Sequence, residues 1–467
     1  MKLEKKYGLF TAISMVVGIV IGSGVFFKAQ NILEKTQGNA FVGILAWLIG
    51  GVIMIICSTI FAILATKYGK INGLVDYAEA VVGKKYSYLI AWFIATIYYP
   101  AMTSVLAWVT ARYTGELFGW ALNSANVMTL GVFFLVISYA INALAPKIAG
   151  KVQVSTTIIK LIPLFLMGIV GTIYGLVETT LSFEVVNGEV IKTGTSHLQI
   201  LIENFNNSGD FSIKALFTGV VAAAFAYEGW IVATSINGEL KNSKKNLPLA
   251  LFFGSLVIMF IYILYYIGVL GGALVDVLQV GGAQYAFLEI FGSYIGVILN
   301  VFIVISCFGT LNGLMVATTR AFYTIAEKKS GPKPEVFDKI DSHTNMPTNS
   351  CIIGLVLVGI WYVYFYGANL TQSWFGPFSF DSSELPIITM YGFYILIFIL
   401  MIKKERKELG VFKGIILPIL GLFAASFMII AAIYAHGIAV VFYLIVFVII
   451  MLIGLLIEYF NYKKRKN

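Results

Sequence analysis

The chain has 467 residues, of which 59% are hydrophobic and only 12% are charged, and its mean hydropathy is +0.89. Soluble domains are about half apolar and about a quarter charged, so this composition excludes an ordinary water-soluble protein. The net charge of +9 does not indicate nucleic-acid binding, because the basic residues gather in short stretches between long apolar segments.

Apolar runs of roughly 20 residues, the length that crosses a bilayer, recur along the whole chain. They predict an all-α polytopic membrane protein with twelve transmembrane helices. The expected helices are 9–27, 42–66, 86–118, 126–144, 152–176, 214–240, 248–270, 291–323, 348–367, 384–402, 412–435 and 439–460. Most of the 32 Lys and Arg residues fall in loops on the side of both termini, so the positive-inside rule predicts cytoplasmic ends. Lys28 and Lys35 are among the few expected outside.

The first expected span is interrupted near its centre by Gly22-Ser23-Gly24. A membrane helix keeps its backbone hydrogen bonds internal, and unwound backbone is tolerated where it lines a cavity. The N–H groups that begin the outer half would suit a carboxylate, and the carbonyls freed around Val20 would suit an ammonium group. The alternative is that the two glycines only allow close helix packing.

Lys160 lies in the middle of the fifth expected span. A lysine at the bilayer centre costs about 2.5–3.5 kcal/mol on insertion scales, so this one is expected to face protein or water. Its ammonium could bridge the carbonyls that the broken first helix sets free. The alternative is a lysine that snorkels to the membrane surface.

A second interruption, Tyr227-Glu228-Gly229, divides the sixth expected span into an outer half, 214–225, and an inner half, 231–240. The two breaks lie five spans apart, and an odd number of spans inverts a repeat in the membrane. Broken helices at matching places in two inverted halves indicate a transporter binding site. The sequence therefore predicts a 5+5 inverted repeat, made of 1–176 and 177–402 with an outer loop 177–213 and an inner loop 324–347, followed by 403–467 with the last two spans.

Glu228 is the only acidic residue in the middle of an expected span. It could cap the N-terminus of the outer half of the sixth span, where the helix dipole favours a negative charge. It could instead hydrogen-bond across the bundle as a neutral acid, or carry a proton. The three Cys and three His residues are scattered, so neither a metal site nor a cofactor is expected.

Three motifs resemble those of the amino acid–polyamine–organocation superfamily, and of its L-amino acid transporter branch in particular. They are the first-span segment 18–26, the sixth-span segment 225–230, and Ile159-Lys160-Leu161. The resemblance covers nearly the whole chain and implies the fold in which helices 1 and 6 are broken. It departs from the family at Glu228, where many members have a smaller residue.

The resemblance also implies roles for single residues. The substrate-binding residues would be Val20, Gly22, Ser23, Gly24, Phe225 and Glu228. N–H groups of Ser23 and Gly24 would hold the substrate carboxylate, and main-chain carbonyls of Val20, Phe225 and Glu228 would hold the amino group. Phe225 would also be a gate above the substrate. Lys160 would take the place of sodium and link the first and eighth spans.

The sequence therefore predicts a sodium-independent transporter of small neutral L-amino acids of the alanine, serine and cysteine class. Obligate antiport by alternating access is the expected mode, and a proton-coupled symporter that uses Glu228 or Lys160 is the alternative. An enzyme is disfavoured because the spans hold almost no clustered His, Asp, Glu or Ser residues. A channel is the other rival, and single-file currents without saturation would identify it.

The surroundings of the protein follow from the same features. The resemblance implies a cell-membrane location, and the small extramembrane parts look bacterial. Human relatives pair with a glycoprotein through a cysteine between spans three and four. That loop has no cysteine here, so no disulfide-linked subunit is expected.

Overall fold

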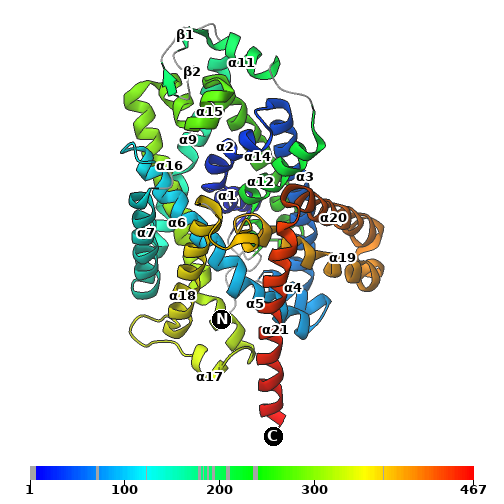
Figure 1. Ribbon diagram of the computed structural model, residues 1–467. Coiled ribbons are helices and arrows are strands. Elements are labelled where there is room, and N and C mark those ends of the chain that lie inside the picture. Colours follow the sequence, from blue (N-terminus) through cyan, green and yellow to red (C-terminus); the bar gives the residue numbers. More distant parts are fainter. Residues whose placement is uncertain are drawn as a thin grey trace. The chain divides into compact units, whose positions relative to one another are not determined.

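The computed structural model describes residues 7–69, 73–121, 124–176, 180–181, 184–186, 189–191, 195–206, 211–234, 240–371 and 373–466. Nearly all of them are helical (Figure 1). Contacts group the chain into two compact units that interleave in sequence. The first is Met1–Ile63, Thr157–Ser306 and Ile430–Ala435, and the second is Leu64–Thr156, Cys307–Ile429 and His436–Asn467.

The first unit holds both expected breaks. Its elements are α1 (Leu9–Val20), α2 (Gly24–Lys35), most of α3 (Ala40–Tyr68), α9 (Leu161–Leu166), the π-helix η2 (Met167–Gly171), α10 (Thr172–Gly175), β1 (Thr180–Leu181), β2 (Glu184–Val186), β3 (Glu189–Ile191), β4 (Thr195–Ser196), α11 (His197–Asn206), α12 (Ile213–Tyr227), α13 (Trp230–Ala233), α14 (Ser243–Gly272), α15 (Val275–Gly281) and the first half of α16 (Gln284–Glu327). Strand β1 pairs with β4 and β2 with β3, both antiparallel, within the expected outer loop.

The second unit consists of helices and helical turns. They are α4 (Leu74–Val81), α5 (Lys84–Phe93), the π-helix η1 (Ile94–Tyr98), α6 (Tyr99–Glu116), α7 (Ala125–Leu144), nearly all of α8 (Pro146–Ile159), the second half of α16, α17 (Pro334–Phe337), α18 (Thr348–Phe365), the π-helix η4 (Tyr366–Leu370), the 3-10 turn η5 (Gly376–Phe378), α19 (Leu385–Val411), the π-helix η6 (Phe412–Ile416), most of α20 (Leu417–His436) and α21 (Ala439–Lys466). The single-turn α17 lies in the expected inner loop.

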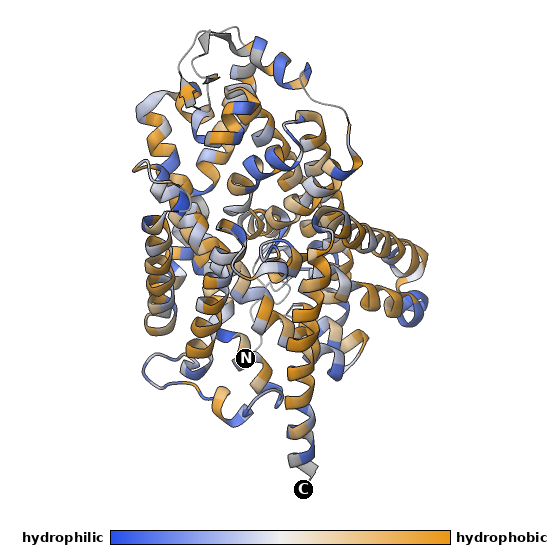
Figure 2. Ribbon diagram, in the orientation of Figure 1, coloured by the Kyte–Doolittle hydropathy of each residue, from blue (hydrophilic) through white to orange (hydrophobic). Residues whose placement is uncertain are grey.

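Nine helices among the described residues are long and apolar enough to cross a membrane, and the bent pair α1 and α2 makes up to ten. Hydrophobic residues dominate these helices, and hydrophilic ones gather in connections and at helix ends (Figure 2). The expected fifth span is divided at Lys160, which leaves the shorter apolar helix Leu161–Tyr174. The expected tenth and eleventh spans form one run, Leu385–His436, with non-helical backbone at Gly410. The polytopic helical fold is confirmed, while the number twelve and the inverted repeat remain predictions.

The first broken span is longer than the sequence indicated. It continues to Lys35 instead of ending at Phe27, because α2 adds two further helical turns. Lys28, which was expected just beyond the end of this span, lies within α2 and is 1% exposed. The expected end at Phe27 was wrong because a single lysine at the end of an apolar run reads as the end of a span.

A break in the second unit shows how this chain satisfies freed backbone groups. Pro100 has no N–H, so it cannot donate to the carbonyl of Thr96 four residues earlier. The π-helix η1 ends just before it, and the indole N–H of Trp361 donates to the Thr96 carbonyl at 3.0 Å. The π-helical turn before Pro100 therefore leaves a carbonyl without its usual helical donor, and a side chain from α18 supplies one.

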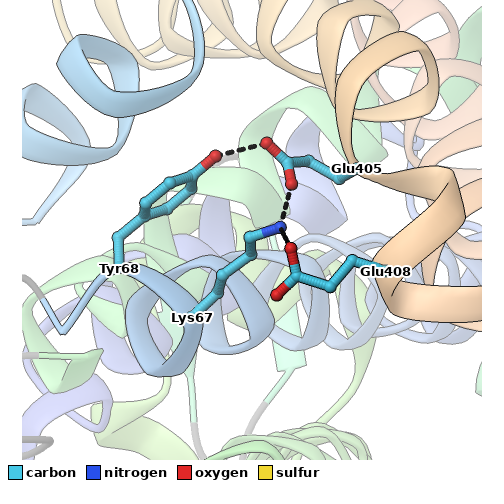
Figure 3. Close-up of polar contacts among 4 residues, drawn as sticks. All are labelled: Lys67, Tyr68, Glu405 and Glu408. Carbon is cyan, nitrogen blue, oxygen red and sulfur yellow. Dashed lines mark hydrogen bonds and ion pairs between the residues drawn. The ribbon is translucent and has the colours of Figure 1, made fainter.

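The end of α3 and the middle of α19 share a charged cluster in the second unit (Figure 3). The Lys67 ammonium donates to carboxylates of Glu405 and Glu408, and the Tyr68 hydroxyl donates to Glu405. The Glu405 side chain is 8% exposed, whereas that of Glu408 is 72% exposed. Loss of its partners would therefore destabilise the protein more at Glu405, whose carboxylate is buried, than at Glu408, which water can solvate.

Candidate functional site

Helix α1 stops inside the first unit, and its final carbonyls find partners outside the helix. The last four backbone carbonyls of a helix accept no hydrogen bond from an N–H of the same helix. Here the Val17 carbonyl accepts from the Ile21 N–H at 3.0 Å, and the Gly18 carbonyl accepts from the Lys160 ammonium at 2.6 Å. The Val20 carbonyl accepts only a long bond, 3.5 Å, from the Tyr262 hydroxyl. This negative end of α1 therefore retains capacity for a cation.

Helix α2 restarts the chain at a 54° angle to α1. Ser23 is its N-cap and is fully buried, and the first N–H groups after it have no acceptor within the helix. A Cβ on Gly24 would lie 2.6 Å from the Cα of Ala226, closer than side chains approach a backbone. Gly24 is therefore required so that the two broken spans can touch, which is the packing role that the sequence offered as an alternative. Packing and unwinding occur together at this site.

The sixth span breaks where expected, with α12 ending at Tyr227 and the short α13 starting at Trp230. Glu228 has extended backbone and Gly229 has φ of 100°, a left-handed conformation that favours glycine. A Cβ on Gly229 would lie 3.6 Å from the Ile19 carbonyl oxygen, so this break faces the end of α1. Ser23 and Glu228, which mark the two interruptions, are 205 positions apart in the sequence. The two interruptions nevertheless meet within the first unit.

Glu228 does not occupy the position predicted for it. It follows the C-terminus of α12, the outer half of the span, whose N-terminus is capped by Ser212. The expectation of an N-terminal cap on that half is therefore wrong, because Glu228 follows the C-terminal end of α12. Glu228 is half-buried. Half of the expected inner half, 235–239, lies outside the described residues.

Lys160 sits between α8 and α9 and is 5% exposed. Its bond to the Gly18 carbonyl joins the fifth span to the end of α1. In an unbroken helix that carbonyl would accept from the N–H of Gly22, so the lysine replaces the bond that the break removes. The snorkelling alternative is excluded by this burial. The expected link to the eighth span remains a prediction.

Tyr262, on α14, was missed by the sequence reasoning. Its hydroxyl donates to the Ala226 carbonyl at 3.1 Å and reaches the Val20 carbonyl at 3.5 Å, so one side chain joins both broken spans. The ring also packs on Tyr227, with centroids 5.1 Å apart. The chain has 26 tyrosines, and nothing in the local sequence of α14 distinguishes this one.

Phe225, the expected gate, is buried near the end of α12. Its ring meets that of Phe27 edge-on, with centroids 5.9 Å apart. The structure thus gathers the ends of α1, α2 and α12 in the first unit, together with Lys160 and Tyr262. Amide donors lie on one side of the break and carbonyl acceptors on the other, which suits a ligand that carries both charges.

Comparison with known proteins identifies the family. The amino acid permease family model matches residues 7–462. The serine/threonine exchanger SteT of Bacillus subtilis is 28% identical over 87% of this chain and 85% of its own length. The human cystine/glutamate transporter is 23% identical over 75% of this chain, and the rat large neutral amino acids transporter small subunit 2 is 26% identical over 72%.

This chain spans 66% of the human relative and 60% of the rat relative. The expected resemblance to the L-amino acid transporter branch is confirmed by these matches, and no enzyme is among the relatives compared. Since the family match runs through nearly the whole sequence, the chain belongs to the amino acid permease family and is a multi-pass membrane transporter rather than an enzyme.

Proposed function

We propose that the protein is a sodium-independent antiporter of small neutral L-amino acids such as alanine, serine and cysteine. The observation that carries the proposal is the meeting of the two broken spans beside Lys160. An α-amino acid bears a carboxylate and an ammonium on neighbouring atoms. The start of α2 offers N–H groups to the carboxylate, and the ends of α1 and α12 offer carbonyls to the ammonium.

The proposed substrate contacts are made by backbone groups at the two breaks. Ser23 and Gly24 supply N–H donors, with Gly22 completing the unwound segment. The Val20 carbonyl and the Phe225 carbonyl each accept a bond of only 3.5 Å, so each can accept a shorter one from a substrate. The Glu228 carbonyl is the third proposed acceptor. Phe225 then covers the substrate from the outer side.

Sodium independence is proposed because a fixed cation already holds the broken helix. Carbonyls of unwound helices coordinate sodium in many transporters, and here a lysine ammonium bonds such a carbonyl. No ion has to bind before the site assembles. The substrate itself then becomes the ligand that permits the change between outward-facing and inward-facing states, which favours exchange over net uptake.

The choice of small neutral substrates draws on one relative. SteT is named as a serine/threonine exchanger and covers more of this chain than the cystine/glutamate transporter does. We further propose twelve spans in a 5+5 inverted repeat with two additional spans, both termini in the cytoplasm of a bacterial cell, and function without a disulfide-linked glycoprotein. The topology is supported by the charge distribution and by the positions of the two breaks. The bacterial origin is proposed from the small extramembrane parts, and the lack of a linked subunit from the missing cysteine between spans three and four.

Counterflow in liposomes tests the proposal. The purified full-length protein is reconstituted in sodium-free buffer, with unlabelled serine inside and labelled serine outside. We expect saturable uptake that needs internal amino acid and does not change when sodium is added. Liposomes without internal amino acid are the control.

Uptake into such empty liposomes that follows an inward proton gradient would overturn the exchanger assignment. It would favour the proton-coupled symporter, whose structural support is the half-buried carboxylate of Glu228 at the break. Uptake that rises linearly with substrate and never saturates would instead indicate a channel.

A further inference from the structure

The segment between the tenth and eleventh expected spans carries five basic residues within the eleven positions 403–413, and two glutamates lie among them. The positive-inside rule accounts for basic residues at the inner end of a span. It does not account for their arrangement, because the structure separates the acidic residues of this segment from the basic ones.

The acidic face of this part of α19 is turned toward other elements of the second unit. Glu405 and Glu408 are three positions apart, so they lie on one face of the helix. Both accept from the Lys67 ammonium at the end of α3 (Figure 3). Lys404, beside this face, donates from its ammonium to the Val81 carbonyl at the end of α4, at 2.7 Å. Contacts within the protein therefore occupy this side of α19.

Three basic residues lie on the opposite face of the same turns. Lys403, Arg406 and Lys407 follow the spacing i, i+3 and i+4, so they form one stripe along α19. At 3.6 residues per turn this stripe is centred about 180° around the helix from the two glutamates. All three side chains are exposed. The helix is therefore acidic toward the protein and basic toward its surroundings.

The turn into the next helix adds a fourth cation to this stripe. Gly410 has φ of 73° and redirects the chain into η6. A Cβ on Gly414 would lie 2.7 Å from the Cα of Arg406, so the backbone of η6 packs directly on the turn of α19 that bears Arg406. Lys413, the exposed neighbour of Gly414, is thereby brought next to the stripe. We call this group the basic corner: Lys403, Arg406, Lys407 and Lys413.

Exposed apolar side chains lie at the same bend. Val411 is 66% exposed and Phe412 is 61% exposed. The bend interrupts the run Leu385–His436, whose helices are apolar enough to cross a membrane, so the basic corner belongs at a membrane surface. A free anion would gain nothing from Val411 and Phe412. A lipid offers a phosphate to the cations and acyl chains to the apolar pair.

We propose that the basic corner binds the phosphate group of an anionic phospholipid, while Val411 and Phe412 contact its acyl chains. None of its four cations forms an ion pair with another described residue, so their charges are available to a headgroup. A zwitterionic lipid carries a cation of its own, which these charges repel, so the corner selects lipids with a net negative charge. This binding site is separate from amino acid transport and uses none of the proposed substrate contacts.

The size of the effect follows from the attraction between single basic residues and an anionic membrane surface. Each such residue strengthens binding about fivefold, so three together would contribute up to about a hundredfold. One headgroup does not contact all of them equally, and salt screens the attraction. We therefore expect the loss of three charges to lower the preference for an anionic lipid by at least about fivefold.

The experiment is native mass spectrometry of the purified full-length protein, titrated with phosphatidylglycerol or phosphatidylcholine of identical acyl chains. We expect the wild type to bind phosphatidylglycerol at least about tenfold more tightly than phosphatidylcholine. The triple variant Lys403→Gln, Arg406→Gln, Lys407→Gln should lose most of this preference. Glycerol phosphate, at the concentration of the lipid, should not displace phosphatidylglycerol; displacement would show a site for free phosphate and overturn the assignment to a lipid.

The matched control is the triple variant Lys241→Gln, Lys244→Gln, Lys245→Gln, which removes three exposed lysines from another connection and changes the net charge equally. It should keep the wild-type preference, and an equal fall in both triple variants would show a general charge effect and overturn the proposal. Should the first variant not fold, equal binding of both lipids by the wild type would overturn the proposal, and would favour an acidic soluble partner for the basic corner. Because the experiment measures lipid binding, its failure is distinct from a failure of the proposed antiport.

Discussion

Replacement of Lys160 by methionine isolates the bond that holds the broken first span. Methionine keeps an unbranched apolar stem but cannot donate to the Gly18 carbonyl, which accepts from the lysine at 2.6 Å. A hydrogen bond from a charged group contributes about 1.5–3 kcal/mol. Since about 1.4 kcal/mol is a factor of ten in an equilibrium, loss of the assembled site should slow exchange about 10- to 100-fold.

Stability should respond less than transport. The substitution removes a bond, but it also removes the cost of burying an ammonium that is only 5% exposed. These two effects oppose each other, so we expect the free energy of unfolding to change by about 1 kcal/mol or less. A purely structural lysine would show the opposite pattern, with lower stability and an unchanged rate for the protein that remains folded.

The assay compares initial rates of serine exchange in liposomes with thermal unfolding in detergent. Lys151→Met is the control, since Lys151 is an exposed lysine of the preceding helix α8 and should leave both quantities unchanged. Exchange by Lys160→Met within about twofold of the wild type, at equal protein content, would refute the reasoning. Lys160 would then be a packing residue.

Three further substitutions test contacts within one or other of the two units. Gly24→Ala forces a Cβ against the backbone of α12, so it should abolish exchange and lower stability by about 1–3 kcal/mol, whereas Gly359→Ala, with open space around it, should be neutral in both assays. Tyr262→Phe should raise the KM for serine severalfold with little loss of folded protein, because it removes the hydroxyl that joins the two breaks; an unchanged KM would contradict this role. Glu405→Gln should lower the thermal unfolding temperature through a loss of about 2 kcal/mol, and the exposed Glu408→Gln through less than about 1 kcal/mol; equal shifts would count against the burial argument.

The local sequence was sufficient to find both interruptions. Gly22-Ser23-Gly24 and Gly229 mark their own positions, since glycine is what an unwound or left-handed backbone needs. Lys160 was also recognisable, because a lysine at that depth is too costly to face lipid. The number of spans was harder to decide, since one lysine divides the fifth and Gly410 only bends the run that contains the tenth and eleventh.

Hydrophobicity and membrane thickness act on each segment separately, so the sequence by itself determined a polytopic helical protein with breaks near residues 23 and 228. Only the tertiary structure decided which groups meet. It joined Lys160 to the Gly18 carbonyl, brought Tyr262 to both breaks, placed Glu228 after a helix C-terminus and buried Lys28 against Phe225. Each of these contacts depends on the rotation and approach of helices distant in sequence, which no local pattern encodes.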